Sequence, residues 1–513
     1  MILPPWTSKL RDWQVRAVAA ACTRSGQDFL AMATPAAGKT RFALRVAHQY
    51  LSDRAAQRIV VVCPTNHLRT QWAQAAGQVG IQLDPALTNE SLWEARDYHG
   101  CVVTYQQVCL APAQFDRACR LRPTLVILDE LHHAGDGKDW GTSLKTAFGV
   151  AVFRLALSGT PFRSDNDPIP FVTYDNGVSR SNFTYGYPDA IRDGVCRPMY
   201  FPSYEGDVSW GDNDGIYRAT FSKELNQKQS RRRLRTALLR EEWLGPVIRD
   251  ANDRLNGLRS GSHPHAGGLV IAMDQDHARS IQALMQSRLG LRVPLAISDD
   301  PESSAVIEEF ATSSRPWLLA VRMVSEGVDI PRLRIGVYAT NVSTEMYFRQ
   351  AVGRFVRMRP ELGRPQKAWL YLAKDPTLID YARTIEWERG HYIEDADEPI
   401  VVDPTGQGRQ GSSFFPISAV SSADELFSVE DRNSRVLPTV GEMPAPLHAQ
   451  KADLRGLHRT LVGQVARKTG SDHRTINAEL CRRTGGPIDR ATMAQLTRRL
   501  LLLEKWKDYG AIG

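Results

Sequence analysis

Eight short apolar runs, in two groups of four, constrain the fold of this chain more than any other feature of its sequence. Each run is rich in Val, Ile and Leu and ends at a polar or turn residue, as buried strands do. Amphipathic stretches such as "HLRTQWAQAAGQVG" separate the runs. This alternation predicts parallel sheets covered by helices, so we expect an α/β chain with two such domains. The first four runs span residues 58–65, 100–105, 124–130 and 153–160, and the last four span 267–274, 316–323, 333–340 and 367–375.

Composition sets the expected limits of the domains. The first α/β domain is expected over residues 1–210 and the second over 266–399. Residues 211–265 include the basic stretch "RRRLRTALLR" and are expected to form a helical connector. Residues 400–449 are rich in Gly, Ser and Pro and lack apolar periodicity, which indicates a linker. Residues 450–513 contain three helical patterns and predict a small α-helical domain.

The charge of the chain is concentrated at its C-terminal end. Residues 451–513 hold 13 Lys and Arg against 6 Asp and Glu, an excess equal to the formal net charge of the whole chain, +7. A basic appendage on a neutral body indicates a polyanionic partner, most simply nucleic acid. The alternative is a solubilising helical face that binds nothing.

Other sequence features narrow the expected compartment. No window approaches the ~18 consecutive apolar residues of a membrane span, and the first residues do not form a signal peptide, so we expect no membrane partner. The 7 cysteines contain no C-x-x-C pair. This usage is typical of a reducing compartment and argues against a zinc ribbon, so we expect a cytoplasmic protein.

The stretch "ATPAAGKT", residues 33–40, is similar to a phosphate-binding loop. The pattern G-x-x-x-x-G-K-[ST] has glycine where this chain has Ala33, but an alanine keeps the backbone N–H donors that cradle phosphates. Gly38 stands where the chain must turn most tightly, Lys39 can reach the β and γ phosphates, and Thr40 can hold Mg²⁺. A predicted strand precedes the loop and a predicted helix follows it, which is the context that such a loop requires.

A second element supports the nucleotide site. In "LVILDELHH", Asp129 and Glu130 stand at the C-terminal end of a predicted buried strand. Ligands of open α/β sheets bind at that edge. An Asp at this place can hold Mg²⁺ through water, and the adjacent Glu can polarise the attacking water.

Together these motifs resemble those of superfamily 2 helicases, in the group that includes type III restriction motor subunits and excision-repair helicases. The resemblance covers about residues 10–375 and implies two RecA-like domains in tandem, with ATP and Mg²⁺ as cofactors. In "LRDWQ" it points to Arg11 and Gln14 as adenine-side contacts. In the D-E-x-H box it points to His132 as a coupling residue, and in "SGTPFR" to Ser158 and Thr160. The expected ATP contacts of the phosphate loop are Thr34, Pro35, Ala36, Ala37, Gly38, Lys39 and Thr40. Ala36 departs from the family, whose members mostly have glycine there.

Two motifs of the second domain also match this family. "VSEGVDIP" resembles motif V and implies nucleotide contacts for Gly327 and Asp329. "QAVGRFVR" resembles motif VI and implies catalytic roles for Gln350, Arg354 and Arg357. We expect Arg354 and Arg357, three residues apart on a helix, to share a face, and cations of this kind stabilise transition-state charge on a γ-phosphate. We expect Arg357 to be the principal arginine finger, acting on ATP held between the two domains.

The same resemblance suggests contacts with nucleic acid. Pro64 and Thr65 follow one predicted strand, and Thr104 and Gln106 stand at the end of the next. Such residues would meet the sugar-phosphate backbone without reading bases. The alternative for each Thr is a hydroxyl that bonds to its own backbone. The segment "YGYPDAIRDGVCRP", residues 185–198, resembles a segment that follows motif III in restriction-type motors, and the sequence assigns it no role.

Three functional hypotheses follow from this resemblance. The first is an ATP-dependent DNA helicase or translocase of repair, recombination or phage-type replication. The second is the motor subunit of a restriction or defence complex that moves on duplex DNA without unwinding it. The third is an ATP-switched nucleic-acid clamp or an RNA helicase.

The C-terminal helices carry an apolar stripe at helical spacing. The stripe predicts the core of a small bundle, with a surface for a protein partner as the alternative. The arginine pairs at 482–483 and 498–499 either grip phosphates or lie exposed. The stripe consists of Leu496, Leu500, Leu503 and Trp506.

Overall fold

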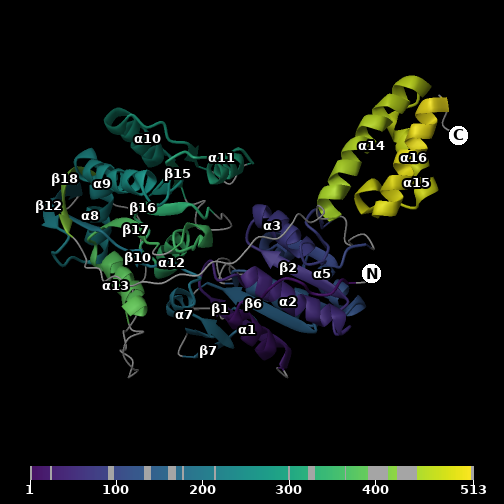
Figure 1. Ribbon diagram of the computed structural model, residues 1–513, viewed down its shortest axis with the longest axis horizontal. Helices are drawn as coiled ribbons and strands as arrows, with labels where there is room; N and C mark the ends of the chain where they lie inside the picture. Colours follow the sequence, from purple (N-terminus) through teal and green to yellow (C-terminus); the bar gives the residue numbers. More distant parts are fainter. Residues whose placement is uncertain are drawn as a thin grey trace. The chain divides into compact units, whose positions relative to one another are not determined.

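The computed structural model describes residues 3–23, 26–89, 97–131, 140–159, 169–175, 178–212, 215–297, 301–321, 330–363, 366–390, 414–424 and 447–509. These residues form two compact units (Figure 1). The first unit holds residues 1–32, 38–184 and 439–513, and the second holds 33–37 and 185–438. The helices in the described part of the chain include none that is both long enough and apolar enough to cross a bilayer.

The first unit is built on a seven-stranded sheet with the strand order β3-β4-β2-β5-β6-β1-β9. The contiguous pairs from β3 to β1 are all parallel. Every residue of β2, β5 and β6 is buried, which is why these strands are almost continuously apolar. The strands of this sheet are β1 (Asp28–Ala33), β2 (Arg58–Cys63), β3 (Leu83–Asp84), β4 (Gly100–Thr104), β5 (Thr124–Leu128), β6 (Phe153–Ser158) and β9 (Phe183–Tyr185).

Helices connect these strands and cover the sheet. Helices α2 and α3 pack against the central strands, and α5 packs against α6. A short hairpin of β7 (Thr173–Asp175) and β8 (Val178–Arg180) precedes β9. The helices are α1 (Asp12–Thr23), α2 (Lys39–Ser52), α3 (Asn66–Gly77), α4 (Tyr105–Leu110), α5 (Pro112–Leu121) and α6 (Trp140–Phe148).

The second unit contains a nine-stranded sheet with the main order β12-β11-β17-β16-β13-β15-β14. The strands from β17 to β14 are parallel to their neighbours, and β12 lies antiparallel to β11. Its strands are β10 (Met199–Tyr200), β11 (Ser203–Asp212), β12 (Gly215–Thr220), β13 (Gly267–Ala272), β14 (Leu295–Ala296), β15 (Trp317–Val321), β16 (Leu333–Ala339), β17 (Ala368–Ala373) and β18 (Phe414–Asp424). Its helices are α7 (Tyr187–Arg192), α8 (Gln227–Leu239), α9 (Glu241–Ser260), α10 (Gln275–Leu289), α11 (Pro301–Thr312), α12 (Glu345–Gly353) and α13 (Pro376–Gly390), with a 3₁₀ turn η3 (Pro360–Leu362).

Two segments of the second unit differ from the sequence-based expectation. Residues 414–424, expected to belong to a linker, form β18 and pair antiparallel with β11 over nearly its whole length. Residues 211–265, expected to be a helical connector, also contain the end of β11 and the strand β12. Both places contain residues that are depleted in strands, Pro416 and Asp424 in β18 and Gly211, Asp212 and Gly215 at the turn between β11 and β12, and these residues obscured the strand pattern.

The C-terminal residues form a three-helix bundle of α14 (Leu447–Thr469), α15 (His473–Thr484) and α16 (Met493–Tyr509), with a 3₁₀ turn η4 (Ile488–Arg490) before α16 (Figure 1, yellow). The predicted stripe supplies part of its interior, since Leu496, Leu503 and Trp506 are buried while Leu500 is half-buried. The α/β class with two parallel sheets and C-terminal helices is confirmed.

Arg499 corrects one part of the prediction for the bundle. Its side chain is buried, its Nε donates to Thr484 Oγ1 at 2.8 Å, and its guanidinium also donates to the carbonyl of Gly486. It therefore holds the end of α15 and is not available to a phosphate. Arg498, its neighbour in the sequence, is exposed.

One carboxylate accepts two of the hydrogen bonds that attach the bundle to the rest of the first unit. Asp97 Oδ1 accepts from the ammonium of Lys451 on α14 at 2.7 Å, and Asp97 Oδ2 accepts from the N–H of Met493 at the start of α16 at 2.9 Å. The side chain of Lys451 is fully buried and its ammonium lies 4.1 Å from the ring centroid of Tyr98. Burial lowers the pKa of Lys451, and the partner Asp97 opposes that shift.

We predict that Asp97→Ala weakens the attachment of the bundle more than Lys451→Ala does. The first change leaves a buried ammonium without its counter-charge, whereas the second leaves Asp97 partly exposed and still bonded to Met493. We expect a loss of about 2–3 kcal/mol for Asp97→Ala, below the ~3–5 kcal/mol typical of fully buried pairs because Asp97 is 23% exposed. Hydrogen exchange of the amides in α14 and α16 measures the loss. The exposed Arg498→Ala is the matched control, and equal protection in all three variants would contradict the prediction.

Candidate nucleotide site

The candidate site lies at one edge of the first sheet. Strands β4, β2, β5, β6 and β1 are adjacent and parallel, so their C-terminal ends lie at the same edge. The segments that leave this edge contain most of the residues singled out in the sequence of this unit. They lie at or directly beyond the strand ends: 33–40 at β1, 64–65 at β2, 104–106 at β4, 129–130 at β5 and 158–159 at β6.

The phosphate loop turns at Gly38, which has φ 94° and is the N-cap of α2. Lys39 and Thr40 are the first residues of that helix, and the first N–H groups of a helix have no partner within it. Gly38 has no side chain to cap them, which suits a helix N-terminus that binds an anion. The predicted loop followed by a helix is thus present in the structure.

The two alanines of the loop have different backbone conformations. Ala33, which replaces the first glycine of the pattern, is the last residue of β1 and is extended, so no glycine is needed there. Ala36, which departs from the family, has φ 67°. This left-handed conformation costs a residue with a Cβ about 1–2 kcal/mol. The strain in the loop therefore lies at Ala36.

Gln14 and Arg11, the predicted adenine-side residues, lie beside the loop. Gln14 is buried, its Nε2 donates to the carbonyl of Gly38 at 2.9 Å, and its Oε1 accepts from the N–H of Arg11 at 2.8 Å. A Cβ on Gly38 would lie 2.8 Å from Gln14 Nε2. The position therefore needs glycine for close approach as well as for its φ.

Lys39 forms an ion pair with Glu130. Their Nζ and Oε1 atoms lie 2.9 Å apart, and both side chains are largely buried. Glu130 Oε2 also accepts from the N–H of Gly159 at 3.3 Å, which links this carboxylate to the segment after β6. Glu130 has φ 48°, an uncommon conformation for this residue type that clusters at functional sites. The pair places a cation and a candidate base side by side.

Asp129 is buried and held from two sides. Its Oδ2 accepts from Trp72 Nε1 at 2.8 Å, and its carbonyl accepts from the hydroxyl of Tyr105 at 2.9 Å. Burial raises the pKa of Asp129 to about 6, with a smaller contribution from the charge of Glu130, while Lys39 and the Trp72 N–H oppose the rise. A bound cation would relieve the cost of this buried carboxylate. A carboxylate and a hydroxyl are the hard oxygen ligands that Mg²⁺ prefers, so Asp129 and Thr40 fit that ion.

Trp72, Tyr105 and Gly159 were not recognised from the sequence. The sequence presents Trp72 only as part of an amphipathic helix, and Tyr105 only as the end of a strand. Their role is to orient acids that come from another strand. Because each of these residues acts on an acid from a different strand, no local sequence pattern marks its role.

The residues predicted to meet nucleic acid lie at the same edge. Cys63 and Thr104, which end β2 and β4, are direct neighbours in the sheet. Thr104 Oγ1 accepts from the N–H of Gln107 at 3.2 Å and caps α4, so the alternative interpretation of this hydroxyl is the one seen. Thr65 precedes α3 without a side-chain cap, and Gln106 is exposed. Contacts of Pro64, Thr65, Thr104 and Gln106 with nucleic acid stay predictions.

The motif VI residues lie on the second unit, and one expectation about them is wrong. Gln350 lies on α12, but that helix ends at Gly353 with Arg354 as its C-cap. Arg357 lies beyond the helix and forms an isolated antiparallel bridge with Cys196. Arg354 and Arg357 therefore do not share a helical face, because the chain leaves the helix between them.

Residues 33–37 are grouped with the second unit by their contacts. The N–H of Thr34 donates to the carbonyl of Tyr185 at 3.0 Å, and the Cys196 thiol lies 3.7 Å from the carbonyl oxygen of Pro35. A Cβ on Gly353 would lie only 2.5 Å from Pro35 Cβ. The glycine of "QAVGR" is thus explained by close packing against the phosphate loop.

The remaining predicted residues are those of coupling and of motif V. Ser158 is fully buried at the end of β6 and pairs with Met32 of β1. His132, Thr160, Gly327 and Asp329 lie outside the described residues.

Comparison with known proteins adds a family to this geometry. Residues 7–163 match the family model described as type III restriction enzyme, res subunit. An uncharacterized protein of Mycobacterium tuberculosis (strain ATCC 25618 / H37Rv) is 40% identical over 556 aligned residues, which cover 96% of this chain and 92% of that protein. The DNA 3'-5' translocase XPB2 of Sulfurisphaera tokodaii is 23% identical over 68% of this chain and 79% of that protein.

A solved structure supports the fold. A fragment described as the HsdR subunit of a type I restriction enzyme from Vibrio vulnificus YJ016 superposes with a TM-score of 0.52 at 17% identity, covering 74% of this chain and 66% of that chain. This likeness concerns the fold, an α/β core of RecA-like parallel sheets followed by C-terminal helices.

We predict opposite effects of glycine at the two alanines of the loop. Ala36→Gly removes the left-handed strain of about 1–2 kcal/mol and adds an entropic cost of about 0.5–1 kcal/mol, so the folded state should gain a few tenths of a kcal/mol or more. Ala33→Gly restores the usual pattern but weakens a buried strand by about 0.5–1 kcal/mol. Urea unfolding of both variants measures the difference. A stabilising Ala33→Gly together with a destabilising Ala36→Gly would show that the strain is misplaced.

Proposed function

The chain belongs to the superfamily 2 helicase-like proteins, in one family with the mycobacterial proteins, and we propose that it is an ATP-dependent DNA helicase or translocase. In this proposal, hydrolysis of ATP drives movement on DNA or its unwinding. The observation that carries the proposal is the edge of the first sheet, where Lys39, Glu130 and Asp129 meet beside an uncapped helix N-terminus.

The proposed chemistry follows from the charges at this edge. The N-terminus of α2 and the ammonium of Lys39 suit the β and γ phosphates, and Gln14 and Arg11 border the same loop. Mg²⁺ would bind at Thr40 and Asp129 and would neutralise charge on the phosphates. A γ-phosphate would compete with Glu130 for Lys39, and this competition would release the Glu130 carboxylate to orient the attacking water.

The second unit supplies the other proposed catalytic groups. We assign Arg354 and Arg357 the role of stabilising negative charge on the transferred phosphoryl group, with Gln350 beside them in the motif. His132, Ser158 and Thr160 are the proposed coupling residues. These roles come from the family motif, and substitution tests them residue by residue.

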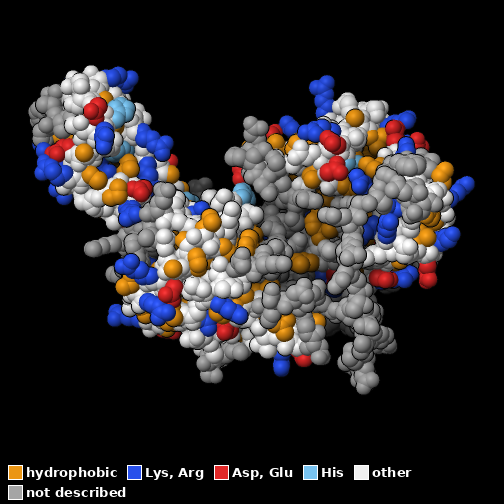
Figure 2. All heavy atoms as spheres, turned by 180° about the vertical axis from the view of Figure 1, so that it is seen from behind, with side chains coloured by type: hydrophobic (Ala, Val, Ile, Leu, Met, Phe, Trp, Pro, Cys, Tyr) orange, Lys and Arg blue, Asp and Glu red, His pale blue; other side chains and the backbone are white. Residues whose placement is uncertain are grey.

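DNA is the polymer on which we propose that the protein moves, because of the positions of four predicted contact residues and the charge of the C-terminal bundle. Pro64, Thr65, Thr104 and Gln106 leave the sheet at the edge that holds the nucleotide site. Lys and Arg side chains are also more numerous than Asp and Glu over the visible face of the C-terminal bundle (Figure 2). Exposed Leu457 and Leu501 on the same bundle are candidates for contact with a protein partner.

We predict that Lys39→Ala and Glu130→Gln each lower DNA-stimulated ATP turnover by at least ~100-fold. The two variants should differ in binding. Glu130→Gln keeps Lys39 and should bind ATP at least as tightly as the native chain, because a competing carboxylate is gone, whereas Lys39→Ala should bind it more weakly. Steady-state ATPase and fluorescent-nucleotide titration measure the two effects. Native turnover in Glu130→Gln would remove the catalytic assignment.

The same ATPase assay with different nucleic acids tests which polymer stimulates ATP turnover. We expect stimulation by single-stranded, duplex or forked DNA, and less by RNA. Strand displacement together with triplex displacement then separates unwinding from duplex translocation. Stimulation by RNA alone, or by no polymer, would contradict a DNA motor.

We predict that the bundle binds DNA phosphates through its exposed cations. Arg467, Arg474 and Arg498 lie exposed on α14, α15 and α16, so changing all three to Gln should leave the bundle core intact. The slope of log K against log salt for duplex DNA should become shallower by up to ~0.9 for each phosphate that is no longer neutralised. Arg292→Gln, an exposed change on the second unit, is the control. An unchanged slope would exclude these arginines from DNA binding.

A further inference from the structure

A short segment before the second sheet is bonded to the chain that carries Arg357. Arg197 lies between α7 and β10, in the stretch to which the sequence assigned no role. Its backbone N–H donates to the carbonyl of Val356 at 2.6 Å, and its neighbour Cys196 bridges Arg357 in antiparallel fashion. Tyr187 fixes the segment, since its hydroxyl donates to the carbonyl of Arg197 at 2.9 Å.

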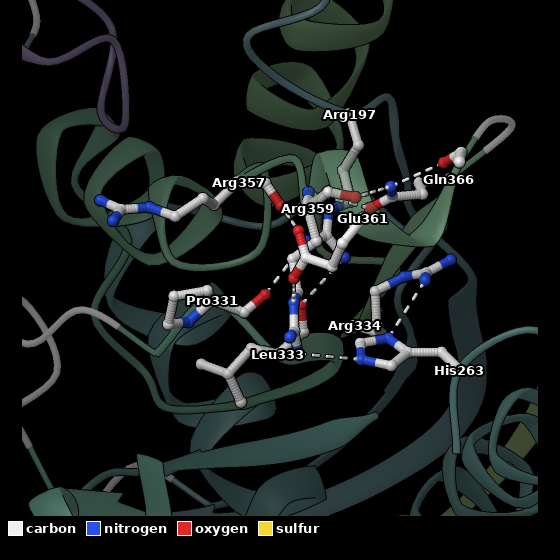
Figure 3. Close-up of polar contacts among 10 residues, drawn as sticks. Arg197, His263, Pro331, Leu333, Arg334, Arg357, Arg359, Glu361 and Gln366 are labelled. Atoms are coloured by element: carbon white, nitrogen blue, oxygen red, sulfur yellow. Dashed lines mark hydrogen bonds and ion pairs between the residues drawn. The ribbon is translucent and has the colours of Figure 1, made fainter. Parts of the chain in front are cut away.

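The guanidinium of Arg197 joins two motifs of the second unit (Figure 3). Its Nη2 donates to the carbonyl of Pro331 at 3.1 Å and also to the carbonyl of Arg357, and its Nη1 lies 3.4 Å from the carbonyl of Leu333. Pro331 ends the "VSEGVDIP" segment and Arg357 ends "QAVGRFVR". One fully buried side chain therefore holds both motif ends by their backbones.

The surroundings of Arg197 make this arrangement costly. Near Arg197 lie the side chains of Arg334, Arg359 and His263 (Figure 3). Glu361 Oε1 accepts from Arg359 Nε at 2.5 Å. Burial lowers the pKa of Arg197 to about 9, and the charges of Arg334 and Arg359 act in the same direction. The guanidinium thus stays charged at neutral pH but is held among like charges.

The side chain of Arg357 points the other way. Figure 3 shows its guanidinium directed away from Arg197, while its backbone carbonyl faces that residue. Because Arg357 lies beyond the end of α12, helical hydrogen bonds do not fix its backbone. The bond from Arg197 takes their place.

We propose that Arg197 is a positioning residue for Arg357: it fixes the backbone from which the arginine finger projects and ties it to the end of motif V. This inference rests on the proposed function, because it needs Arg357 to act on the nucleotide. The Arg197 side chain contacts the finger only through its carbonyl. Its effect must therefore disappear when the finger itself is removed.

A double-mutant cycle on the full chain tests this dependence. The variants are Arg197→Gln, Arg357→Ala and the double change, with DNA-stimulated kcat, KM for ATP, Kd for ADP and thermal midpoint as readouts. We expect Arg357→Ala to lower kcat by ~10³-fold or more. Arg197→Gln should lower kcat by about 10- to 100-fold, the cost of a small misplacement, with Kd for ADP unchanged within about twofold. The double variant should have the kcat of Arg357→Ala alone.

Arg332→Gln is the matched structural control. Arg332 is also buried and also binds backbone carbonyls, those of Phe310, Arg315 and His265. Within the described part of the chain, its hydrogen bonds do not reach residues 356–357. This variant should lose thermal stability comparably to Arg197→Gln and keep native kcat at a temperature well below unfolding. If Arg197→Gln does not fold, Arg197→Lys replaces it in the cycle. Lysine keeps the charge but lacks the planar fork, so it should show a smaller loss of kcat in the same pattern.

The outcomes separate the two proposals. Native DNA-stimulated kcat in Arg357→Ala would overturn the finger assignment and with it the positioning role of Arg197, while the proposed function would stand. The proposed function itself would fail if the native chain showed no DNA-stimulated ATP turnover. A low kcat in Arg357→Ala with native kcat in both Arg197 variants would overturn only the positioning role. Multiplicative losses in the double variant would also overturn it, because they would mean that Arg197 acts independently of the finger.

Discussion

The shared direction of adjacent strands in the first sheet is the constraint on which the site depends. Because β2, β5, β6 and β1 are parallel, the segments that leave them must emerge at one edge, whatever their separation in the sequence. Lys39 and Glu130 are 91 positions apart and meet there at 2.9 Å. The fixed sheet also allows strained conformations in the loops, at Ala36 and Glu130, since a buried strand holds the start of each loop.

Much of this arrangement could be predicted, because buried parallel strands and phosphate loops are local patterns. Neighbouring residues alone are enough to recognise the strand before Asp129 and the loop that ends in Gly38–Lys39–Thr40. What failed depended on distant partners. The end of α12 before Arg357 follows from pairing with Cys196, and β18 follows from pairing with β11. The cap made by Thr104 was one of two alternatives that spacing alone could not separate.

Buried arginines account for a further part that sequence reasoning missed. Arg197, Arg332 and Arg499 each donate to backbone carbonyls at places where regular hydrogen bonding stops. In a sequence such residues look like surface charge, and the basic character of this chain is partly of this internal kind. A count of Lys and Arg in the sequence therefore overstates the positive charge that a polyanion can reach. Exposed residues such as Arg467, Arg474 and Arg498 supply the accessible charge.

The indole of Trp72 has a practical consequence. Its Nε1 lies 2.8 Å from a carboxylate oxygen of Asp129, the residue best suited to hold a divalent ion. Indole emission responds to charge placed near the ring, so a cation at this carboxylate would change the fluorescence of one tryptophan among the 11 in the chain. Subtracting the spectrum of a Trp72→Phe protein would isolate that signal. If Mg²⁺ binds as proposed, this indole would report its occupancy without an added label.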